Sequence, residues 1–383
     1  MQREYFKRVA IVADQMVAFG GADREMFSML KLFPKADIFT MFFDSKKYPM
    51  LKQRVFTSFV QRIPKVRSFY RHFKVLTPFA YESFDLRGYD LVISISAGPA
   101  KGVITGINQP HIAMVMTPPR SLWDNEMNIR ASRFKRIYKP LSTVLNTYMR
   151  MWDLSISKRV DYWTANSKYI AEKIKKRYGV DATVLYPGVL EESFESVSES
   201  RKREVRERYG VEGDFVLVVS RLYDYKRVDW AIRAAIATNR QLLVIGEGPD
   251  LKYLEGVANG NPLIRFLGFL EDDAEVRVFY SMADLLLFCG VEDFGLVPVE
   301  AMAQGAPVFA YGEGGVLETV KGGVSGEFFS SEKELVSLLK KFSKRMYNPR
   351  EIVKGARVFS EERFLINLEK FINEVYEREK RES

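Results

Sequence analysis

The chain has 383 residues, 47% of them hydrophobic, and a formal charge of +9. This length exceeds what one hydrophobic core usually supports, so we expect two domains. The longest apolar runs, such as residues 285–288, fall far short of the roughly 20 residues that a membrane-spanning helix needs. The charged N-terminus continues into a strand-like run with no apolar leader. These features predict an unprocessed cytoplasmic protein.

The excess of Lys and Arg predicts an anionic partner, which can be a nucleotide phosphate, a phospholipid or a nucleic acid. The sequence shows no recognised nucleic-acid-binding module, so we rank nucleic acid last. A single cysteine, Cys289, excludes an intrachain disulfide, and two histidines leave little material for a histidine-rich metal site or a Ser/His/Asp triad. We therefore expect chemistry that needs neither a metal ion nor a bound cofactor.

Short apolar, β-branched runs alternate with segments of helical period along the whole chain. This pattern is typical of α/β proteins, in which crossover helices cover parallel sheets. The expected strands are 9–13, 38–43, 91–94, 112–116, 162–165 and 183–186 in the first half, and 215–220, 242–245, 264–266, 285–288 and 307–310 in the second. Each half is predicted to form its own doubly wound, Rossmann-like sheet, with a ligand-binding cleft between the two.

The boundary between the halves is expected near Pro187 and Gly188, which end the last strand of the first half before a charged segment. Apolar residues recur at helical spacing from residue 363 onward and predict a terminal amphipathic helix. We therefore expect an N-terminal domain at 1–188 that includes the helix 363–383, and a C-terminal domain at 189–362.

Two cations, Arg221 and Lys226, lie on a loop between a strand and a helix. An Arg grips phosphate oxygens in a bidentate fork and a Lys adds a mobile point charge, so the pair suits a diphosphate, although for this loop taken alone a solvated basic loop is the slightly favoured interpretation. The next strand ends at Gly246, where a glycine lets the backbone approach a ligand closely.

The segment from Glu292 to Glu300 is more specific. A strand ends, a loop with Gly295 follows, and a helix begins that carries the second carboxylate. Glu292 can accept hydrogen bonds from sugar hydroxyls, and Glu300 can hold the hydroxyls of a ribose. Backbone N–H groups of Gly295 and Leu296 can face phosphate at the helix N-terminus.

At these residues the sequence resembles the retaining glycosyltransferases of family 4, which have the GT-B fold. The motifs are Glu-x7-Glu at 292–300, Ser-Arg-Leu-x3-Lys-Arg at 220–227, and 311–316 with Glu318. The resemblance implies two Rossmann-like domains facing a central cleft, with the terminal helix crossing back to the first domain.

The resemblance also implies roles for individual residues. Arg221 and Lys226 would bind the donor diphosphate, Glu292 the transferred sugar and Glu300 the nucleotide ribose. Phe294, Gly295 and Leu296 would line the sugar and phosphate through their backbone, and Gly20 and Gly21 would close over the phosphates from the other domain. The acceptor hydroxyl would attack from the face that the nucleotide leaves, and a donor phosphate oxygen would take its proton.

The segment 116–124 is similar to a Thr-Pro-Pro-Arg...Trp-Asp signature in a branch of this family that often uses GDP-mannose, which makes that compound the preferred donor. Arg120 could reach phosphate or acceptor, or brace the loop against Asp124. The branch usually has a histidine before Thr117, whereas this chain has Met116, and a thioether cannot replace an imidazole as a proton carrier. His111 lies at the start of the strand and is a poor substitute.

Residues 45–81 contain nine Lys and Arg residues and no Asp or Glu, with apolar residues between them at near-helical spacing and Pro64 as a break. A basic, aromatic, amphipathic segment suits an anionic bilayer surface. This favours a lipid-linked acceptor and peripheral attachment to the inner face of the cell membrane. Packing of the segment on its own domain is the alternative.

Two further alternatives stay open. The first is the same chemistry with a UDP-sugar and a soluble acceptor. The second is a catalytically silent subunit that binds sugar nucleotides, which Met116 would explain.

Overall fold

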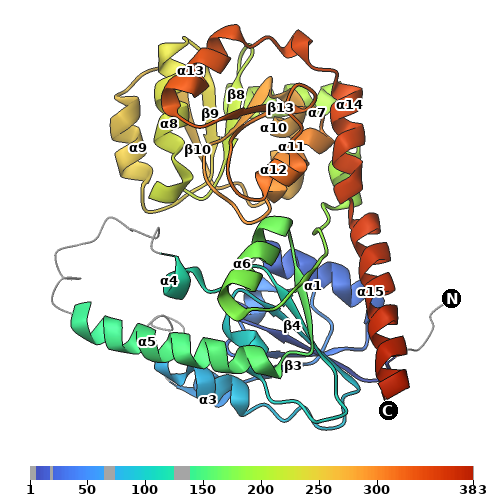
Figure 1. Ribbon diagram of the computed structural model, residues 1–383. Coiled ribbons are helices and arrows are strands. Elements are labelled where there is room, and N and C mark those ends of the chain that lie inside the picture. Colours follow the sequence, from blue (N-terminus) through green and yellow to red (C-terminus); the bar gives the residue numbers. More distant parts are fainter. Residues whose placement is uncertain (1–5, 18–19, 64–73, 125–138, 383) are drawn as a thin grey trace. The chain divides into compact units, whose positions relative to one another are not determined.

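The structure is a computed structural model that describes residues 6–17, 20–63, 74–124 and 139–382. It divides into two compact units (Figure 1). Unit 1 contains the described residues up to Tyr186 together with residues 364–382, and unit 2 contains Pro187–Arg363. The boundaries expected from the sequence lay at 188/189 and 362/363.

Unit 1 contains a sheet of seven parallel strands in the order β3-β2-β1-β4-β5-β6-β7. Its central strands are buried on both faces, which explains why they are continuous apolar runs in the sequence. The strands are β1 (Val9–Ala13), β2 (Asp37–Thr40), β3 (Val55–Thr57), β4 (Leu91–Ser96), β5 (His111–Val115), β6 (Tyr162–Ala165) and β7 (Thr183–Val184).

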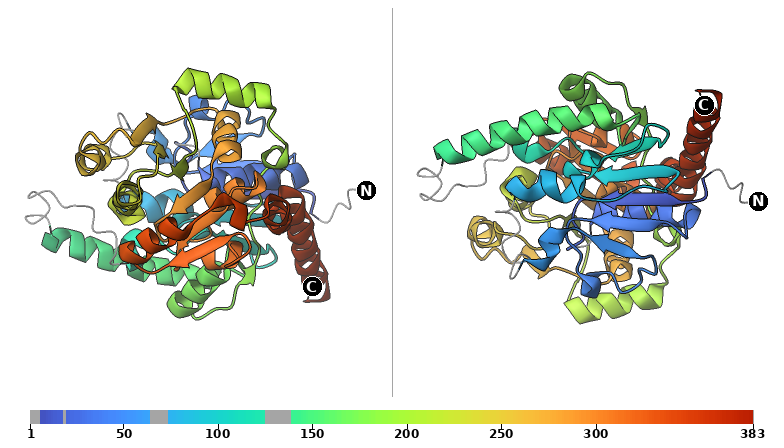
Figure 2. Two further views of the ribbon diagram at one scale, coloured as in Figure 1. Left: turned by 90° about the horizontal axis from the view of Figure 1, so that it is seen from above. Right: turned by 90° about the horizontal axis from the view of Figure 1, so that it is seen from below.

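Helices cover both faces of this sheet, and the last helix of the chain is one of them (Figures 1 and 2). Met29 of α1 and Leu368 of α15 share a core cluster with Ile11, whereas Val60 and Tyr81 pack with Val12 on the opposite face. The α-helices are α1 (Gly21–Leu32), α3 (Thr77–Glu82), α4 (Arg120–Trp123), α5 (Lys139–Ile156), α6 (Lys168–Tyr178) and α15 (Glu361–Glu382). The 3-10 helices are η1 (Ser45–Lys47), η2 (Phe59–Arg62), η4 (Lys74–Leu76), η5 (Pro99–Gly102) and η7 (Ser157–Arg159).

The basic segment 45–81 differs from the expectation of near-helical spacing. Residues 55–57 form strand β3, which pairs with β2 at the edge of the sheet. The β-branched and aromatic residues of this stretch fit a strand, and Val60 after it is fully buried. The helical interpretation is therefore wrong for this part, while residues 64–73 lie outside the described residues.

Unit 2 contains six parallel strands in the order β10-β9-β8-β11-β12-β13. They are β8 (Val216–Val219), β9 (Leu242–Ile245), β10 (Ile264–Gly268), β11 (Leu285–Phe288), β12 (Val308–Tyr311) and β13 (Gly326–Phe329). The α-helices are α7 (Glu199–Tyr209), α8 (Val228–Ala237), α9 (Leu251–Ala258), α10 (Asp273–Met282), α11 (Leu296–Ala303), α12 (Val316–Thr319), α13 (Glu332–Lys341) and α14 (Pro349–Ala356). The 3-10 helices are η8 (Glu191–Phe194), η9 (Asp224–Lys226), η10 (Lys344–Met346) and η11 (Arg357–Phe359).

The prediction of two doubly wound parallel sheets is confirmed. In each sheet the strand order reverses at one place, between β1 and β4 in unit 1 and between β8 and β11 in unit 2. Ligands of such sheets bind beyond the carboxyl ends of the strands at this switch point. The loops after these four strands are therefore the first places to look for a site.

Candidate functional site

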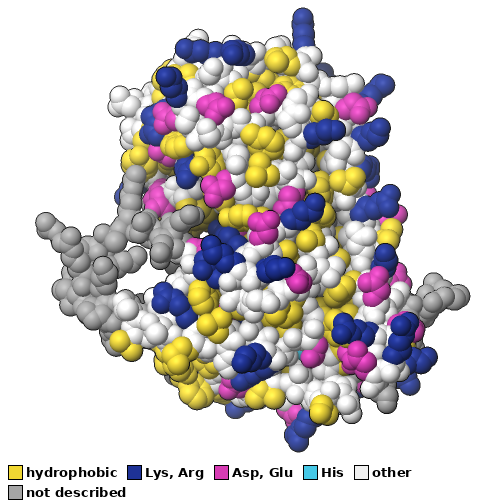
Figure 3. Space-filling view, viewed as in Figure 1, with side chains coloured by type: hydrophobic (Ala, Val, Ile, Leu, Met, Phe, Trp, Pro, Cys, Tyr) yellow, Lys and Arg dark blue, Asp and Glu magenta, His cyan; other side chains and the backbone are white. Residues whose placement is uncertain are grey.

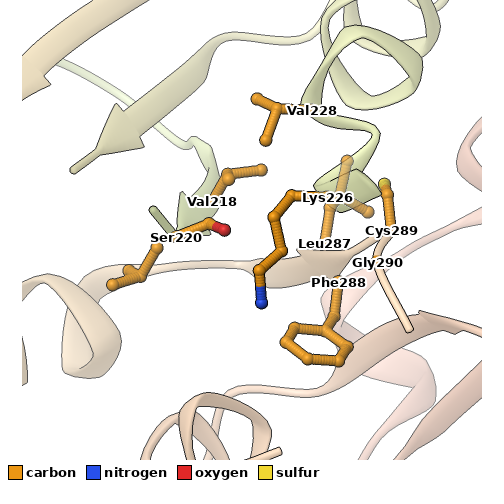
Figure 4. A pocket seen from close by; sticks show the side chains of 9 residues that line it. Val218, Ser220, Lys226, Val228, Leu287, Phe288, Cys289 and Gly290 are labelled. Atoms are coloured by element: carbon orange, nitrogen blue, oxygen red, sulfur yellow. The ribbon is translucent and has the colours of Figure 1, made fainter. Parts of the chain in front are cut away.

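The loops after β8 and β11 flank the switch point of unit 2. Lys226 belongs to η9 after β8, and Glu292 lies on the loop after β11. The Lys226 ammonium group forms an ion pair with the Glu292 carboxylate, and the two side chains are 7% and 29% exposed. Figure 4 shows the Lys226 side chain between Ser220 at the end of β8 and Phe288 at the end of β11. The structure thus brings together two residues that the sequence assigned to one site.

The backbone around Lys226 is held in a specific conformation. Arg227, the next residue, is left-handed with φ of 50°, which is uncommon for a residue other than glycine. Its guanidinium carbon lies 4.3 Å from the ring centre of Tyr311 and 5.0 Å from that of Trp230. A Cβ at Gly290 would lie 3.0 Å from the Lys226 Cα, so the glycine allows the two loops to approach. Stacking on one side and close backbone contact on the other position Lys226.

The other predicted cation, Arg221, is exposed on the same loop, with its guanidinium carbon 5.6 Å from the Tyr223 ring centre. Gly246, at the end of β9, has φ of 129°, and a Cβ there would overlap the carbonyl oxygen of Ser220. Gly246 therefore lets the end of β9 pack against the Arg221 loop. A contact between Gly246 and a ligand stays a prediction.

The second carboxylate, Glu300, lies on α11 and accepts a hydrogen bond of 3.0 Å from the Tyr280 hydroxyl of α10. Helix α11 begins at Leu296 after Gly295, which has φ of 93°. Phe294 is buried, and its ring centre lies 5.5 Å from that of Phe359. Its side chain is thus part of the core, which leaves its backbone for the predicted role at the ligand.

A pair of glycines after β12 supports the Glu292 loop. The Gly315 N–H donates a hydrogen bond of 2.9 Å to the Glu292 carbonyl oxygen. A Cβ on Gly314 or Gly315 would overlap backbone atoms of Glu292 or Asp293. The sequence showed these glycines as part of a motif but gave them no role, and two glycines directly after a strand are the signal for such close packing.

In unit 1, Gly20 and Gly21 lie between β1 and α1 at the switch point of their own sheet. The Gly20 N–H donates a hydrogen bond of 2.8 Å to the Asp23 carboxylate, which also accepts one of 2.9 Å from the Tyr48 hydroxyl. Burial raises the pKa of Asp23 to about 6. The two glycines therefore begin a helix whose first turn is tied to η1, and their role at a donor phosphate stays a prediction.

The segment 116–124 is held by polar contacts within unit 1. Asp124 forms ion pairs with Lys173 at 3.2 Å and Arg177 at 3.7 Å, both on α6. The Trp123 indole N–H donates a hydrogen bond of 2.7 Å to Asp153 of α5. Bracing of the segment through Asp124 thus comes from α6, and the phosphate or acceptor role of Arg120 stays a prediction.

Met116 and His111 were considered above as proton carriers, and both lie inside unit 1. Met116 packs against the core cluster of unit 1 that contains Ile11 and Leu368. His111 is fully buried at the amino end of β5, where its ring nitrogens are 2.9 Å from the Ser94 hydroxyl and 3.1 Å from the Arg159 carbonyl oxygen. Burial lowers the pKa of His111 to about 4. His111 is therefore a neutral structural residue.

Each unit thus holds one doubly wound sheet, and a Lys–Glu pair stands at the switch point of the second. Residues 201–358 match the family of glycosyl transferases group 1. This match confirms, for most of unit 2, the family resemblance predicted from the sequence.

Relatives and solved structures agree with this assignment. The chain is 33% identical over 154 residues to an uncharacterized glycosyltransferase of Methanocaldococcus jannaschii, covering 37% of this chain and 39% of that protein. It is 33% identical over 190 residues to the GDP-mannose-dependent alpha-(1-6)-phosphatidylinositol monomannoside mannosyltransferase of Mycolicibacterium smegmatis, covering 45% and 49%. The matched part thus spans about half the length of these relatives or less.

The fold is shared over almost the whole chain. HepE of Anabaena, solved in complex with UDP, superimposes with a TM-score of 0.70 at 18% identity, covering 95% of this chain and 99% of that one. The chain therefore has the GT-B fold. Over the described ranges, the structure contains no helix that is both long and apolar enough to cross a membrane.

Proposed function

We propose that the protein is a retaining glycosyltransferase that moves a hexose from a nucleotide diphosphate donor to an acceptor hydroxyl. The observation that carries this proposal is the Lys226–Glu292 pair at the switch point of unit 2. A cation for the diphosphate and a carboxylate for the sugar stand side by side, beyond the carboxyl ends of two adjacent parallel strands. The family match over residues 201–358 supports the same chemistry.

In the proposed reaction, Arg221 and Lys226 offset the negative charge that grows on the departing diphosphate. Electrostatic groups fixed in advance are strongest where water is excluded, and Lys226 is almost fully buried. When the donor binds, its diphosphate replaces Glu292 as the partner of Lys226, and the carboxylate is then available to the sugar hydroxyls. Glu300, held by Tyr280, binds the ribose. The acceptor oxygen forms the new bond to the anomeric carbon, the phosphate leaves from the same face, and a phosphate oxygen takes the proton.

The proposed donor is GDP-mannose. The signature at 116–124 supports it, and the Mycolicibacterium relative is named as GDP-mannose-dependent. The alternative is a UDP-sugar, because HepE was solved with UDP. Thermal unfolding in the presence of GDP- and UDP-sugars distinguishes them, since a ligand at about 100 times its Kd adds about 2.7 kcal/mol to stability. We expect GDP-mannose to give the largest rise in Tm. No rise with any nucleotide would remove the sugar-nucleotide site.

The proposed acceptor is a lipid-linked glycan or a glycolipid. The Mycolicibacterium relative is named for a phosphatidylinositol acceptor, and the basic segment 45–81 would suit a lipid surface. The anomeric configuration of the product, read by NMR, tests retention. The proposed reaction uses no metal ion, so EDTA is expected to leave turnover unchanged. Transfer to soluble sugars alone would favour the soluble-acceptor alternative.

The silent-subunit alternative makes a different prediction. Such a protein would bind the donor in calorimetry but would neither hydrolyse it slowly nor transfer its sugar. Measured donor hydrolysis in the absence of acceptor therefore separates the two functions.

A further inference from the structure

Helix α5 exposes a face that carries no charge. From residue 143 to its end at Ile156, its exposed residues are Thr143, Val144, Thr147, Tyr148, Met151, Leu154 and Ser155. The side chains of Val144 and Met151 are 69% and 67% exposed. A helix on the surface of a globular protein normally turns charged and polar residues to the solvent. Among the residues that the structure describes, this stripe therefore stays exposed to the solvent.

The stripe continues onto the neighbouring helix. The Trp152 indole N–H of α5 donates a hydrogen bond of 3.1 Å to Glu82 at the end of α3, so the two helices lie side by side. Phe79 of α3 and Val75 of η4 are 57% and 45% exposed. We define the apolar face as Val75, Phe79, Val144, Tyr148, Met151 and Leu154. Figure 3 shows hydrophobic side chains gathered over α5 and α3 at the lower left.

Beyond α3, the surface combines aromatic and basic side chains. Phe56 of β3 and Phe59 of η2 are 40% and 46% exposed, and η2 shares a core cluster with α3. The Arg54 guanidinium carbon lies 5.2 Å from the centre of the Phe56 ring, and its side chain is 70% exposed. Arg54 also forms an ion pair of 2.9 Å with Asp37, which offsets its charge, and the exposed Arg62 of η2 adds a basic side chain to this part of the surface.

The positive charge of the chain is concentrated in two sequence segments that contain most of these elements and end just before Glu82 of α3 and Asp153 of α5. Segments 45–81 and 127–152 hold 15 of the 58 Lys and Arg residues and none of the 49 Asp and Glu residues. The remaining 43 basic residues are outnumbered by the 49 acidic ones. The positive charge of the whole protein therefore comes from these two segments, and the complementary surface is an anionic one.

We infer that the apolar face inserts into the interfacial layer of an anionic bilayer, with basic residues such as the exposed Arg62 facing lipid headgroups. An uncharged helix face flanked by Lys and Arg is the arrangement of proteins that lie on a membrane surface. A second copy of the chain is a poorer occupant, because a two-fold interface would bring the same basic segments together. The inference rests on the proposed function, since a lipid-linked acceptor is reached from this position.

Vesicle sedimentation tests the inference. The variant Val144→Asp/Met151→Asp removes two exposed apolar side chains and adds two negative charges. Val358→Asp/Ile366→Asp makes the same change at residues that are 59% and 49% exposed elsewhere. We expect the wild type and the control variant to bind phosphatidylcholine vesicles that contain phosphatidylglycerol, and the α5 variant to bind them more than tenfold less tightly.

Several outcomes would overturn the inference. These are equal binding of wild type to neutral and anionic vesicles, no binding to either, equal losses in both variants, or an unchanged α5 variant. Sedimentation velocity without lipid tests whether the face instead binds a second copy of the chain. A wild-type dimer that becomes a monomer in the α5 variant would assign the apolar face to a homodimer interface. All substituted residues are exposed, so similar melting curves are expected for the three proteins.

Donor binding without vesicles keeps this test separate from the proposed function. The α5 variant lies in unit 1, far in sequence from Lys226 and Glu292, and should show the wild-type rise in Tm with GDP-mannose. Loss of vesicle binding with an unchanged rise in Tm supports membrane binding through the apolar face. If the protein binds vesicles but no sugar nucleotide raises its Tm, membrane binding through the apolar face is supported and the proposed function is contradicted.

Discussion

Two Lys–carboxylate pairs, one in each unit, use the same chemical groups in different surroundings. In unit 1, Lys101 and Asp153 are 2.6 Å apart, and both side chains are 2% exposed. Asp153 also accepts hydrogen bonds from the Trp123 indole and the Tyr178 hydroxyl, and Lys101 donates one to the Gly98 carbonyl oxygen. In unit 2, Glu292 is 29% exposed and stands at the end of a strand.

The two ion pairs differ in whether one of their partners can be replaced by a ligand. The Lys101–Asp153 pair is enclosed and its hydrogen-bonding groups are occupied, so it joins η5, α4, α5 and α6 and cannot take a ligand. The Glu292 carboxylate is 29% exposed, and in the proposed reaction the donor phosphate replaces Glu292 as the partner of Lys226 while sugar hydroxyls bind the carboxylate. Enclosure makes an ion pair structural, and partial exposure at a switch point leaves it available for binding.

The largest expected effect follows from breaking the enclosed pair. Lys101→Met should lower the free energy of unfolding by about 3–5 kcal/mol, because it leaves the Asp153 charge buried without its cation. The control is Lys175→Met, which breaks an ion pair with Asp181 whose side chains are 68% and 85% exposed. That change should cost far less, because both charges of an exposed pair stay hydrated when the pair is broken. Equal losses in urea unfolding would show that enclosure does not distinguish the pairs.

Breaking the open pair should affect turnover rather than stability. Lys226→Ala is expected to cut turnover by on the order of a hundredfold, as removal of a single electrostatic group does in other active sites. The Tm should stay close to the wild-type value, because Glu292 is hydrated once its partner is gone. Lys252→Ala, at an exposed position on α9, serves as the control. Near-normal sugar transfer by Lys226→Ala would exclude this lysine from the reaction.

Glu25 shows how burial alone, without a cation as partner, makes the stability of the protein depend on pH. Glu25 on α1 is 5% exposed, and burial raises its pKa to about 8. Its protonated form is favoured in the folded state, so its stabilising contribution is fully present below the ordinary pKa of 4.5 and is lost as the pH rises from there through about 8. Between pH 7 and pH 9 we expect the wild type to lose about 1 kcal/mol more than Glu25→Gln. Parallel pH–stability curves for the two proteins would contradict this.

The smallest effect should come from Tyr280. Tyr280→Phe removes the hydrogen bond to Glu300 and should weaken donor binding about two- to twelvefold, since one hydrogen bond contributes about 0.5–1.5 kcal/mol. Calorimetric titration with the donor measures this change. Tyr209→Phe removes a similar bond to Glu275 and is the matched control. If both variants bind the donor equally well, Tyr280 does not position Glu300 for the ribose.

The sequence predicted the elements that are apolar along their whole length. Strands such as Val9–Ala13 and Leu285–Phe288 have the expected bounds, because central parallel strands are buried on both faces. Strands β3 and β13 were not predicted. The first has three residues, and the second begins at Gly326, where a Cβ would overlap the Val308 carbonyl oxygen. Strand β13 was missed because Gly326, which this strand requires for close packing, has the appearance of a loop residue in the sequence.

In the candidate site, too, some features were predicted from the sequence and others were not. Lys226 and Glu292 were assigned to one site through the family resemblance, and both follow strands, whose ends meet at one edge of a parallel sheet. The contacts of Asp153 with Lys101, Trp123 and Tyr178 could not be predicted, because they join four elements through side chains that have no common spacing. The exposed face of α5 was missed for a related reason, since apolar residues at helical spacing normally indicate a buried stripe.

Helix α15 has a consequence for biosynthesis. Phe364, Leu368 and Phe371 belong to the core of unit 1, although they are among the last residues of the sequence, whereas unit 2 is continuous from Pro187 to Arg363. On the ribosome, unit 2 can therefore complete its core before unit 1 does. The first sheet has to wait, with part of its apolar surface uncovered, until the final helix has been translated.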